Sequence, residues 1–190
     1  MYIHILGVTC AGKDTLIEHI VANNPNCGAI QVGKEFRRRY PAGFFKGLGA
    51  MASTEKEALE IYTEEREKCK DKQFIFVSSQ PRLITQVRAI EESEPGARRI
   101  YIFLRASDEE INRRIEERFP LDSWSMSPDQ LDKNQQSRNL ACQRVTNDRI
   151  QNYDVLLELI VMECTILVID TCPVEVLADL VMSYIQHLRD

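Results

Sequence analysis

Short runs of apolar and β-branched residues recur along this chain, at residues 2–6, 29–32, 73–77, 99–104 and 165–169. Each run has the length of one strand, and the segments between the runs place hydrophobic side chains at helical spacing. Strands that alternate with helices are typical of a parallel sheet covered by helices on both faces. The pattern therefore predicts an α/β fold of three layers around a five-stranded parallel sheet.

Local signals place several of the helices. Thr54 has the form of a capping-box N-cap and predicts a helix that runs to about Lys70. Ser127 followed by proline predicts the start of a second, long helix, with a break allowed near Asn147. A last helix is predicted to begin at Pro173 and to run to the C-terminal end.

Two stretches do not fit the alternation of strands and helices. Residues 38–53 are rich in glycine and aromatic side chains, and residues 119–127 contain a proline, a tryptophan and three serines, with a second proline directly after them. Long irregular connections in compact domains are more often functional lids than filler. We interpret both stretches as flaps over a cleft.

Length and charge exclude several classes of protein. A chain of 190 residues suits one domain, and a net charge of −5 gives no broad basic field to hold a nucleic acid polymer. No apolar run reaches the roughly 18 residues that a membrane helix needs. The sequence predicts a soluble, cytoplasmic protein, and we expect a monomer.

The cysteines and histidines do not have the spacing of metal ligands. The six cysteines lie far apart without a C-x-x-C pair, which argues against a zinc ribbon and against a disulfide framework. The three histidines also lack ligand-like spacing. We expect reduced thiols and no zinc.

The strongest chemical signal follows the first apolar run. Gly7-Val8-Thr9-Cys10-Ala11-Gly12-Lys13-Asp14-Thr15 sets two glycines and a lysine between the predicted strand 2–6 and a helix predicted over residues 15–21. In this context backbone N–H groups converge on the phosphates of a nucleotide, and Lys13 reaches the outer phosphates. The alternative is an ordinary turn before a helix, in which Cys10 is small loop filler. One position departs from the motif, because Asp14 stands where Ser or Thr usually holds Mg²⁺.

A phosphate loop needs further cations to stabilise the transferring group, and arginines are the first candidates. Six of them lie at the edge of a predicted strand or on a helix beside a flap: Arg37, Arg82, Arg114, Arg118, Arg138 and Arg149. Any one of these could be a solvated surface charge. Arg114 and Arg118, however, are four residues apart and therefore lie on one helix face.

The surroundings of these arginines carry a resemblance. Gly33-Lys34-Glu35-Phe36-Arg37 follows the second predicted strand, and Gln80-Pro81-Arg82 with Gln86 follows the third. Residues 108–118 lead into the second flap, Arg138 and Arg149 are eleven positions apart after it, and Asp170-Thr171-Cys172-Pro173-Val174 follows the last strand. Together with the glycine motif, these segments resemble the adenylate kinases and related nucleoside monophosphate kinases over nearly the whole chain.

The resemblance implies a P-loop kinase fold with an acceptor-binding flap at about 33–70 and a lid at about 119–137. The implied catalytic residues are Lys13, Arg82, Arg114, Arg118, Arg138 and Arg149. The implied ATP-binding residues are Gly7, Cys10, Ala11, Gly12, Lys13, Asp14, Thr15, Arg114, Arg118 and Cys172. The implied acceptor-binding residues are Gly33, Arg37, Arg82, Gln86, Arg138 and Arg149. The implied activity is transfer of the γ-phosphoryl group of ATP to a nucleoside monophosphate, AMP first.

The chain departs from the family at several positions. Ser78 stands where the family keeps an aspartate that anchors Mg²⁺ through water, and Val32 replaces a threonine that touches the acceptor base. The acidic residues after the lid arginine are missing at 139–141, and the lid lacks the four cysteines of zinc-bearing lids. We therefore hypothesise that Asp14 anchors Mg²⁺ in place of the strand aspartate. The alternative is that Asp14 merely caps the N-terminus of the helix that follows.

Three functions stay open on the sequence. The Gly-Lys-Asp-Thr segment also resembles phage-type deoxynucleoside monophosphate kinases, so the acceptor could be a deoxynucleotide or another small molecule. In a different class, the chain could bind nucleotides without efficient phosphoryl transfer. The retained Lys13 and the six arginines favour an enzyme.

Overall fold

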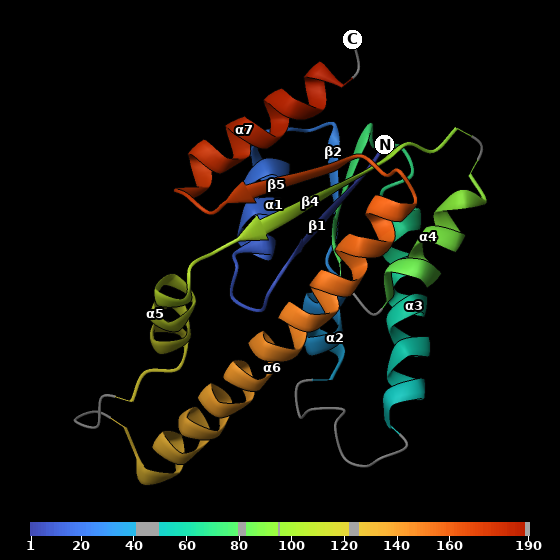
Figure 1. The fold of residues 1–190 in the computed structure, drawn as a ribbon. Helices are drawn as coiled ribbons and strands as arrows, with labels where there is room; N and C mark the ends of the chain where they lie inside the picture. The colour runs from blue at the N-terminus through green and yellow to red at the C-terminus, as the bar shows by residue number, and fades with distance from the viewer. Residues whose placement is uncertain (41–49, 80–82, 95, 122–125, 189–190) are drawn as a thin grey trace.

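A computed structural model describes residues 1–40, 50–79, 83–94, 96–121 and 126–188 of the chain. Along the sequence the elements are β1 (Tyr2–Gly7), α1 (Lys13–Asn23), β2 (Cys27–Ile30), α2 (Val32–Arg39), α3 (Ala50–Lys68), β3 (Phe74–Ser78), α4 (Ile84–Glu92), β4 (Arg99–Arg105), α5 (Asp108–Arg118), α6 (Pro128–Val161), β5 (Ile166–Asp170) and α7 (Val174–His187) (Figure 1).

The five strands form one sheet in the order β2-β3-β1-β4-β5, and every neighbouring pair is parallel. The predicted α/β class and the five parallel strands are confirmed. Every residue of β1 is buried, as expected for a central strand that has helices on both of its faces.

Side chains alternate between two cores as the strands pass through the sheet. Ile3 and Ile5 face the helices α1 and α7, whereas Tyr2 and Leu6 face the side covered by α3, α4 and the C-terminal part of α6. This arrangement gives three layers of secondary structure with the sheet in the middle (Figure 1).

Two element boundaries differ from the sequence prediction. The second strand covers residues 27–30 rather than 29–32, because Val32 begins the helix α2. Helix α3 begins at Ala50, so Thr54 lies inside the helix and the predicted N-cap there is wrong. The alanines and methionine at residues 50–52 are good helix formers and extend the helix toward its N-terminus.

The long helix α6 follows its predicted start closely. The Ser127 side chain accepts from the Gln130 backbone N–H, and the Gln130 side chain accepts from the Ser127 backbone N–H, which completes a capping box. The helix continues through Asn147 without the break that the sequence allowed.

The first predicted flap, at residues 38–53, is shorter than the sequence suggested, whereas the second, at residues 119–127, lies between the end of α5 and the start of α6 as expected. Residues 38 and 39 belong to α2, and residues 50–53 belong to α3. The central parts of both stretches, 41–49 and 122–125, lie outside the described residues.

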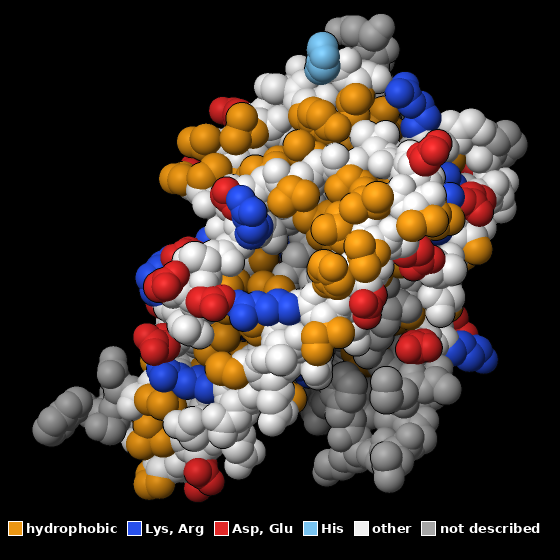
Figure 2. Space-filling view, viewed as in Figure 1, with side chains coloured by type: hydrophobic (Ala, Val, Ile, Leu, Met, Phe, Trp, Pro, Cys, Tyr) orange, Lys and Arg blue, Asp and Glu red, His pale blue; other side chains and the backbone are white. Residues whose placement is uncertain are grey.

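Part of the helical hydrophobic pattern faces solvent instead of the core. Ile150, Tyr153 and Ile160 of α6 are 60%, 62% and 55% exposed, and Val168 of the edge strand β5 is 50% exposed. Figure 2 shows hydrophobic side chains gathered on this face of the molecule, over α6, β5 and α7. Helical spacing alone therefore did not separate the buried stripe of α6 from its exposed one.

The strand order places a crevice at one edge of the sheet. The chain leaves β1 through α1 on one face, and it leaves β3, the neighbour of β1, toward α4 on the other face. Helices that depart to opposite faces open a crevice at the carboxyl ends of such strands, where α/β proteins bind their ligands. The glycine motif and Ser78 both lie at this point.

Candidate active site

The connection from β1 to α1 is a tight loop that we call the glycine loop (residues 7–13). Three of its residues have a positive φ: Gly7 at 141°, Cys10 at 65° and Gly12 at 93°. A Cβ at Gly7 would lie 2.7 Å from the carbonyl oxygen of Leu104 on the neighbouring strand β4. Only glycine fits at that position, and the loop therefore passes close against the sheet before the helix begins.

Lys13 is the first residue of α1 and turns back over the glycine loop. Its Nζ donates to the carbonyl oxygens of Gly7 at 2.7 Å and Val8 at 2.9 Å. Burial lowers the pKa of Lys13, while the carboxylates of Asp148 and Asp14 oppose that shift. An ammonium held in a partly buried loop at a helix N-terminus is suited to binding an anion.

Asp14 reaches the end of the neighbouring strand. Its Oδ1 accepts from the hydroxyl of Ser78 at 2.7 Å, and its Oδ2 lies 3.5 Å from a guanidinium nitrogen of Arg37. The Asp14 carboxylate thus lies beside Ser78, the position at which the family resemblance implies an aspartate. Asp14 also lies in the first turn of α1, where a negative charge suits the helix dipole, so both interpretations of this residue stay open.

Arg114 is the sequence-predicted arginine that contacts the glycine loop directly. A guanidinium nitrogen of Arg114 donates to the carbonyl oxygen of Cys10 at 3.1 Å, and it lies 3.1 Å from where a Cβ would stand on Gly12. The Nε of Arg114 also donates to a carboxylate oxygen of Glu110, one turn earlier on α5, at 2.6 Å.

The other lid-side arginines have different partners. Arg138 donates to the carbonyl oxygen of Phe119 at 2.7 Å, and the guanidinium of Arg118 lies 5.5 Å from the centre of the Phe119 ring. Arg149 forms an ion pair with Asp108 at the start of α5. These contacts link α5 to α6, but they leave Arg118 and Arg138 away from the glycine loop.

The remaining predicted residues divide between placed and undescribed positions. Arg82 lies outside the described residues, together with Gln80 and Pro81. Gln86 is exposed on α4, and Thr15 is exposed on α1. Ala11 is buried in the core beneath the glycine loop, and Cys172 packs against that same core. Gly33, in the first turn of α2, is partly buried.

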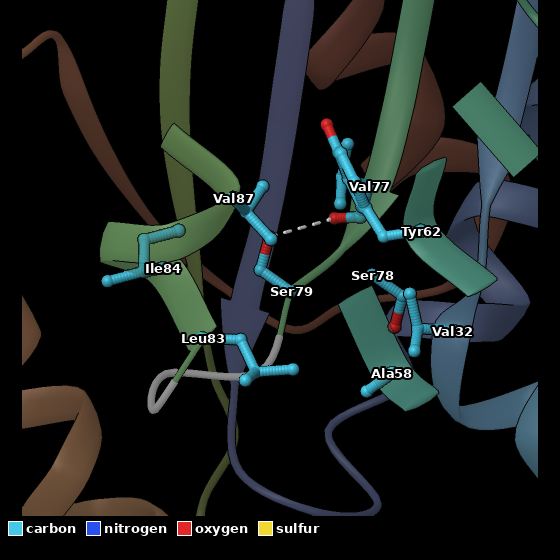
Figure 3. Close-up of a pocket in the computed structure, with 9 residues that line it drawn as sticks. All are labelled: Val32, Ala58, Tyr62, Val77, Ser78, Ser79, Leu83, Ile84 and Val87. Carbon is cyan, nitrogen blue, oxygen red and sulfur yellow. Dashed lines mark hydrogen bonds between the residues drawn. The ribbon is translucent and has the colours of Figure 1, made fainter. Parts of the chain in front are cut away.

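A pocket opens beside Asp14 at the carboxyl end of β3. It is lined by Val32, Ala58, Tyr62, Val77, Ser78, Ser79, Leu83, Ile84 and Val87. Figure 3 shows these side chains coming from the end of β3 and from the helices α2, α3 and α4 around it. The lining is mostly apolar, and Ser78 joins this pocket to the start of α1, directly after the glycine loop, because its hydroxyl donates to Asp14.

A buried polar network that the sequence analysis did not find lies behind this pocket. His4 is fully buried; its Nδ1 lies 2.7 Å from the Ser79 hydroxyl and its Nε2 lies 3.1 Å from a Glu91 carboxylate oxygen. Tyr62 and Arg99 also donate to Glu91. Burial alone would raise the pKa of Glu91, but His4, Tyr62 and Arg99 together lower it. No spacing rule joins five residues from five different parts of the chain, so only the folded chain shows this network.

The sequence analysis also missed Asp148. This α6 residue accepts two hydrogen bonds from Thr9 in the glycine loop, from its backbone N–H and from its hydroxyl, each at 2.7 Å. Its neighbour Arg149 attracted attention through arginine spacing, whereas a single aspartate inside a polar helix gave no signal of its own.

Comparisons with known proteins leave the family open. The sequence matches no protein-family model, and a search of curated proteins finds no match to it.

The described residues contain no group of three or more His, Cys, Asp or Glu side chains that could hold a metal ion, and all six cysteines are free thiols. Within the same part of the chain, no helix has the length and apolar character needed to cross a bilayer.

Proposed function

We propose that this protein is a P-loop kinase that transfers the γ-phosphoryl group of ATP to a nucleoside monophosphate, with AMP as the first candidate acceptor. The observation that carries the proposal is the glycine loop. The loop has three residues with a positive φ, and it lies with the Lys13 ammonium at the crevice between β1 and β3. Arg114 of α5 donates to the loop carbonyl of Cys10. Backbone amides, a lysine and an arginine converging at one helix N-terminus suit a phosphate chain.

In this proposal the triphosphate occupies the glycine loop and the acceptor binds at the pocket beside Ser78. That pocket has room for about one water molecule in this structure, so the helices around it must move apart to admit the acceptor. An oxygen of the acceptor phosphate attacks the γ-phosphorus in line; the bond from that phosphorus to the bridging oxygen breaks, and ADP leaves with the bridging electrons. Lys13 and Arg114 neutralise charge on the phosphate oxygens. No side-chain nucleophile is needed, because the acceptor phosphate itself attacks.

The remaining arginines reach the phosphates only if the elements that carry them move. Arg118, Arg138 and Arg149 lie on α5 and α6 on either side of the predicted lid. Closure of the lid would bring their charges toward the glycine loop and exclude water, which prevents hydrolysis of ATP. Arg37, which lies 3.5 Å from the Asp14 carboxylate, would bind the acceptor phosphate. Arg82, to which the resemblance gives the same role, lies outside the described residues.

The residues present also fit a magnesium ion. The Asp14 carboxylate and the Ser78 hydroxyl are hard oxygen donors 2.7 Å apart at the edge of the crevice. Mg²⁺, when bound there with ATP, would neutralise charge on the β- and γ-phosphates. Asp14 would hold the ion, and Ser78 would orient the Asp14 carboxylate.

Two observations keep a different acceptor under consideration. Val32, which replaces the family's threonine, lines the pocket, and Gln86 is not among the lining residues. A mostly apolar pocket also suits a deoxynucleoside monophosphate or another small phosphate acceptor.

A coupled assay for ADP, run with ATP and a panel of ribo- and deoxynucleoside monophosphates, tests the proposal. We expect turnover with one or a few acceptors and about a 10³-fold loss of kcat in Arg114→Ala, by analogy with arginine fingers. Arg113→Ala is the matched control, because Arg113 is the preceding residue on α5 and pairs with Glu110 and Glu117. Binding of ATP without turnover on any acceptor would favour a nucleotide-binding protein, and normal turnover in Arg114→Ala would reject the site.

A further inference from the structure

The contact between Asp148 and Thr9 places a carboxylate on the glycine loop. A single oxygen, Oδ2 of Asp148, accepts from both the backbone N–H and the hydroxyl of Thr9 at 2.7 Å. Thr9 is the third residue of the loop, and Asp148 lies on α6, more than a hundred residues away in the sequence. Hydrogen bonds to an ionised acceptor are about twice as strong as neutral ones, so this pair fixes the loop to the helix.

The same carboxylate acts on Lys13. Asp148 comes first among the charges that raise the pKa of Lys13 against the effect of burial. Its negative charge therefore stabilises the ammonium from across the loop. A loop donor and the loop lysine both interact with Asp148 as they would with an anionic ligand.

The α6 side of the Asp148–Thr9 contact is also held by neighbouring residues. Asn152, one turn later on α6, donates to the backbone carbonyl of Asp148 at 2.7 Å. Arg149, the next residue, pairs with Asp108 on α5, and Arg114 of α5 donates to the loop carbonyl of Cys10. The glycine loop is thus bound to α6 through the backbone N–H and the hydroxyl of Thr9, and it is bound to α5 through the carbonyl oxygen of Cys10.

We propose that Asp148 is an anionic latch, which holds the glycine loop to α6 until a phosphate chain displaces it. The inference rests on the proposed function, because it requires a phosphate chain in the glycine loop. A phosphate and a carboxylate repel each other at hydrogen-bonding distance, and they compete for the same donor and for the same lysine. Phosphate binding and the Asp148–Thr9 contact are therefore mutually exclusive.

The latch has two consequences. It weakens triphosphate binding, because only the fraction of molecules with the latch open binds the ligand. It also connects the donor site to α6, because release of Asp148 removes the contact that holds the middle of this helix to the glycine loop. A phosphate chain that enters the loop would thereby loosen the middle of α6.

Calorimetry with ATP and with inorganic tripolyphosphate as probes tests the first consequence. Asp148→Asn keeps the shape of the side chain and removes its charge, and we expect it to bind both probes about tenfold more tightly than the natural protein. Asp154→Asn is the matched control, since it makes the same change on an exposed residue of the same helix. It should change the affinity less than about twofold.

Hydrogen exchange of the α6 amides tests the second consequence. In the natural protein, ATP should increase exchange around residues 145–152. In Asp148→Asn the exchange should already be higher without ATP, and the further increase on adding ATP should be smaller. Unfolding in urea checks that both variants are folded.

Unchanged or weaker binding of both probes by Asp148→Asn, in a folded variant, would overturn the latch, as would α6 exchange that does not respond to ATP in the natural protein. Failure of the kinase proposal has a different signature. Tighter triphosphate binding by Asp148→Asn without transfer to any monophosphate would support the latch and reject the kinase.

Discussion

At the scale of single residues, Gly7 shows how backbone geometry shapes the site. Its φ of 141° lies in a region that L residues rarely adopt, and a Cβ there would lie 2.7 Å from the Leu104 carbonyl oxygen. The position therefore combines backbone strain with a collision against an adjacent strand. The glycine motif identified this residue in the sequence, but only the fold shows that β4 is what the side chain would strike.

We expect Gly7→Ala to lower the free energy of unfolding by about 3 kcal/mol, because strain and overpacking add. Gly96→Ala is the control. Gly96 also has a positive φ, of 76°, but no atom lies within 4 Å of its added Cβ. It should cost about 1 kcal/mol, from strain alone. Urea unfolding measures both, and equal costs would contradict the proposed collision.

Glu91 is a second residue whose side chain is expected to contribute strongly to the stability of the fold. Its carboxylate is fully buried and accepts from His4, Tyr62 and Arg99. Removing one partner of a buried charge cluster leaves the other charges without compensation.

Glu91→Gln should therefore destabilise the protein by about 3 kcal/mol. Glu92→Gln, its exposed neighbour paired with Arg88, should cost less than about 1 kcal/mol. Because the pKa of Glu91 is lowered on folding, its contribution is complete above the ordinary carboxyl pKa and is lost as the pH falls through the lower folded value. Urea midpoints of both variants at neutral and acidic pH test this, and a cost for Glu91→Gln that did not shrink in acid would refute the assignment.

At the scale of elements, α6 joins the parts of the candidate site. It has 34 residues, so it is about 51 Å long. Its first turns contact the segment after α5 through Arg138, and its middle contacts the glycine loop through Asp148. Its order near Ser127 therefore bears on the predicted lid at about 119–137, which spans the start of the helix.

Ser127→Ala should cost about 1 kcal/mol of stability, because it removes the N-cap of α6. Hydrogen exchange over residues 128–133 should rise while exchange near residue 148 stays the same. Ser137→Ala places the same substitution inside the helix, where alanine is the better helix former, and it should be neutral or slightly stabilising. A uniform rise of exchange along α6 would mean that the cap does not act locally.

At the scale of the whole molecule, charged and phenolic side chains set limits of stability at both ends of the pH range. Arginine neighbours lower the pKa of Glu35 and of Glu110 to about 2. Burial raises the pKa of Tyr2 and of Tyr101 to about 12, and it raises that of Tyr62 as well. The surface carboxylates are exposed and screened by salt, whereas the phenols are buried.

Stability should therefore fall in two windows. In acid, the unfolded chain binds protons more readily, so stability decreases as the pH drops from 4.5 toward 2. In alkali, the unfolded chain loses phenolic protons first, so stability decreases as the pH rises from 10 through 12. Urea midpoints across both windows test this. Tyr101→Phe should flatten the alkaline decrease, and Tyr153→Phe, whose ring is 62% exposed, should leave it unchanged.

The sequence by itself determined the α/β alternation, the positions of most strands and the glycine loop, because these depend on local periodicity and on backbone freedom. It placed α6 through Ser127 and failed at Thr54, where strong helix formers outweighed a cap signal. The glycine motif led to Lys13 and the resemblance to a family of known layout led to Arg114, and in the fold both side chains donate to carbonyl oxygens of the glycine loop.

Only the tertiary structure decided which groups meet. Asp14 contacts Ser78 across 64 positions of the chain, His4 contacts Glu91 across 87, and Thr9 contacts Asp148 across 139. Such pairs depend on strand order and helix packing, and no local pattern records either. For the same reason the sequence did not show that one hydrophobic stripe of α6 is exposed: helical spacing says which residues share a face, but not what that face meets.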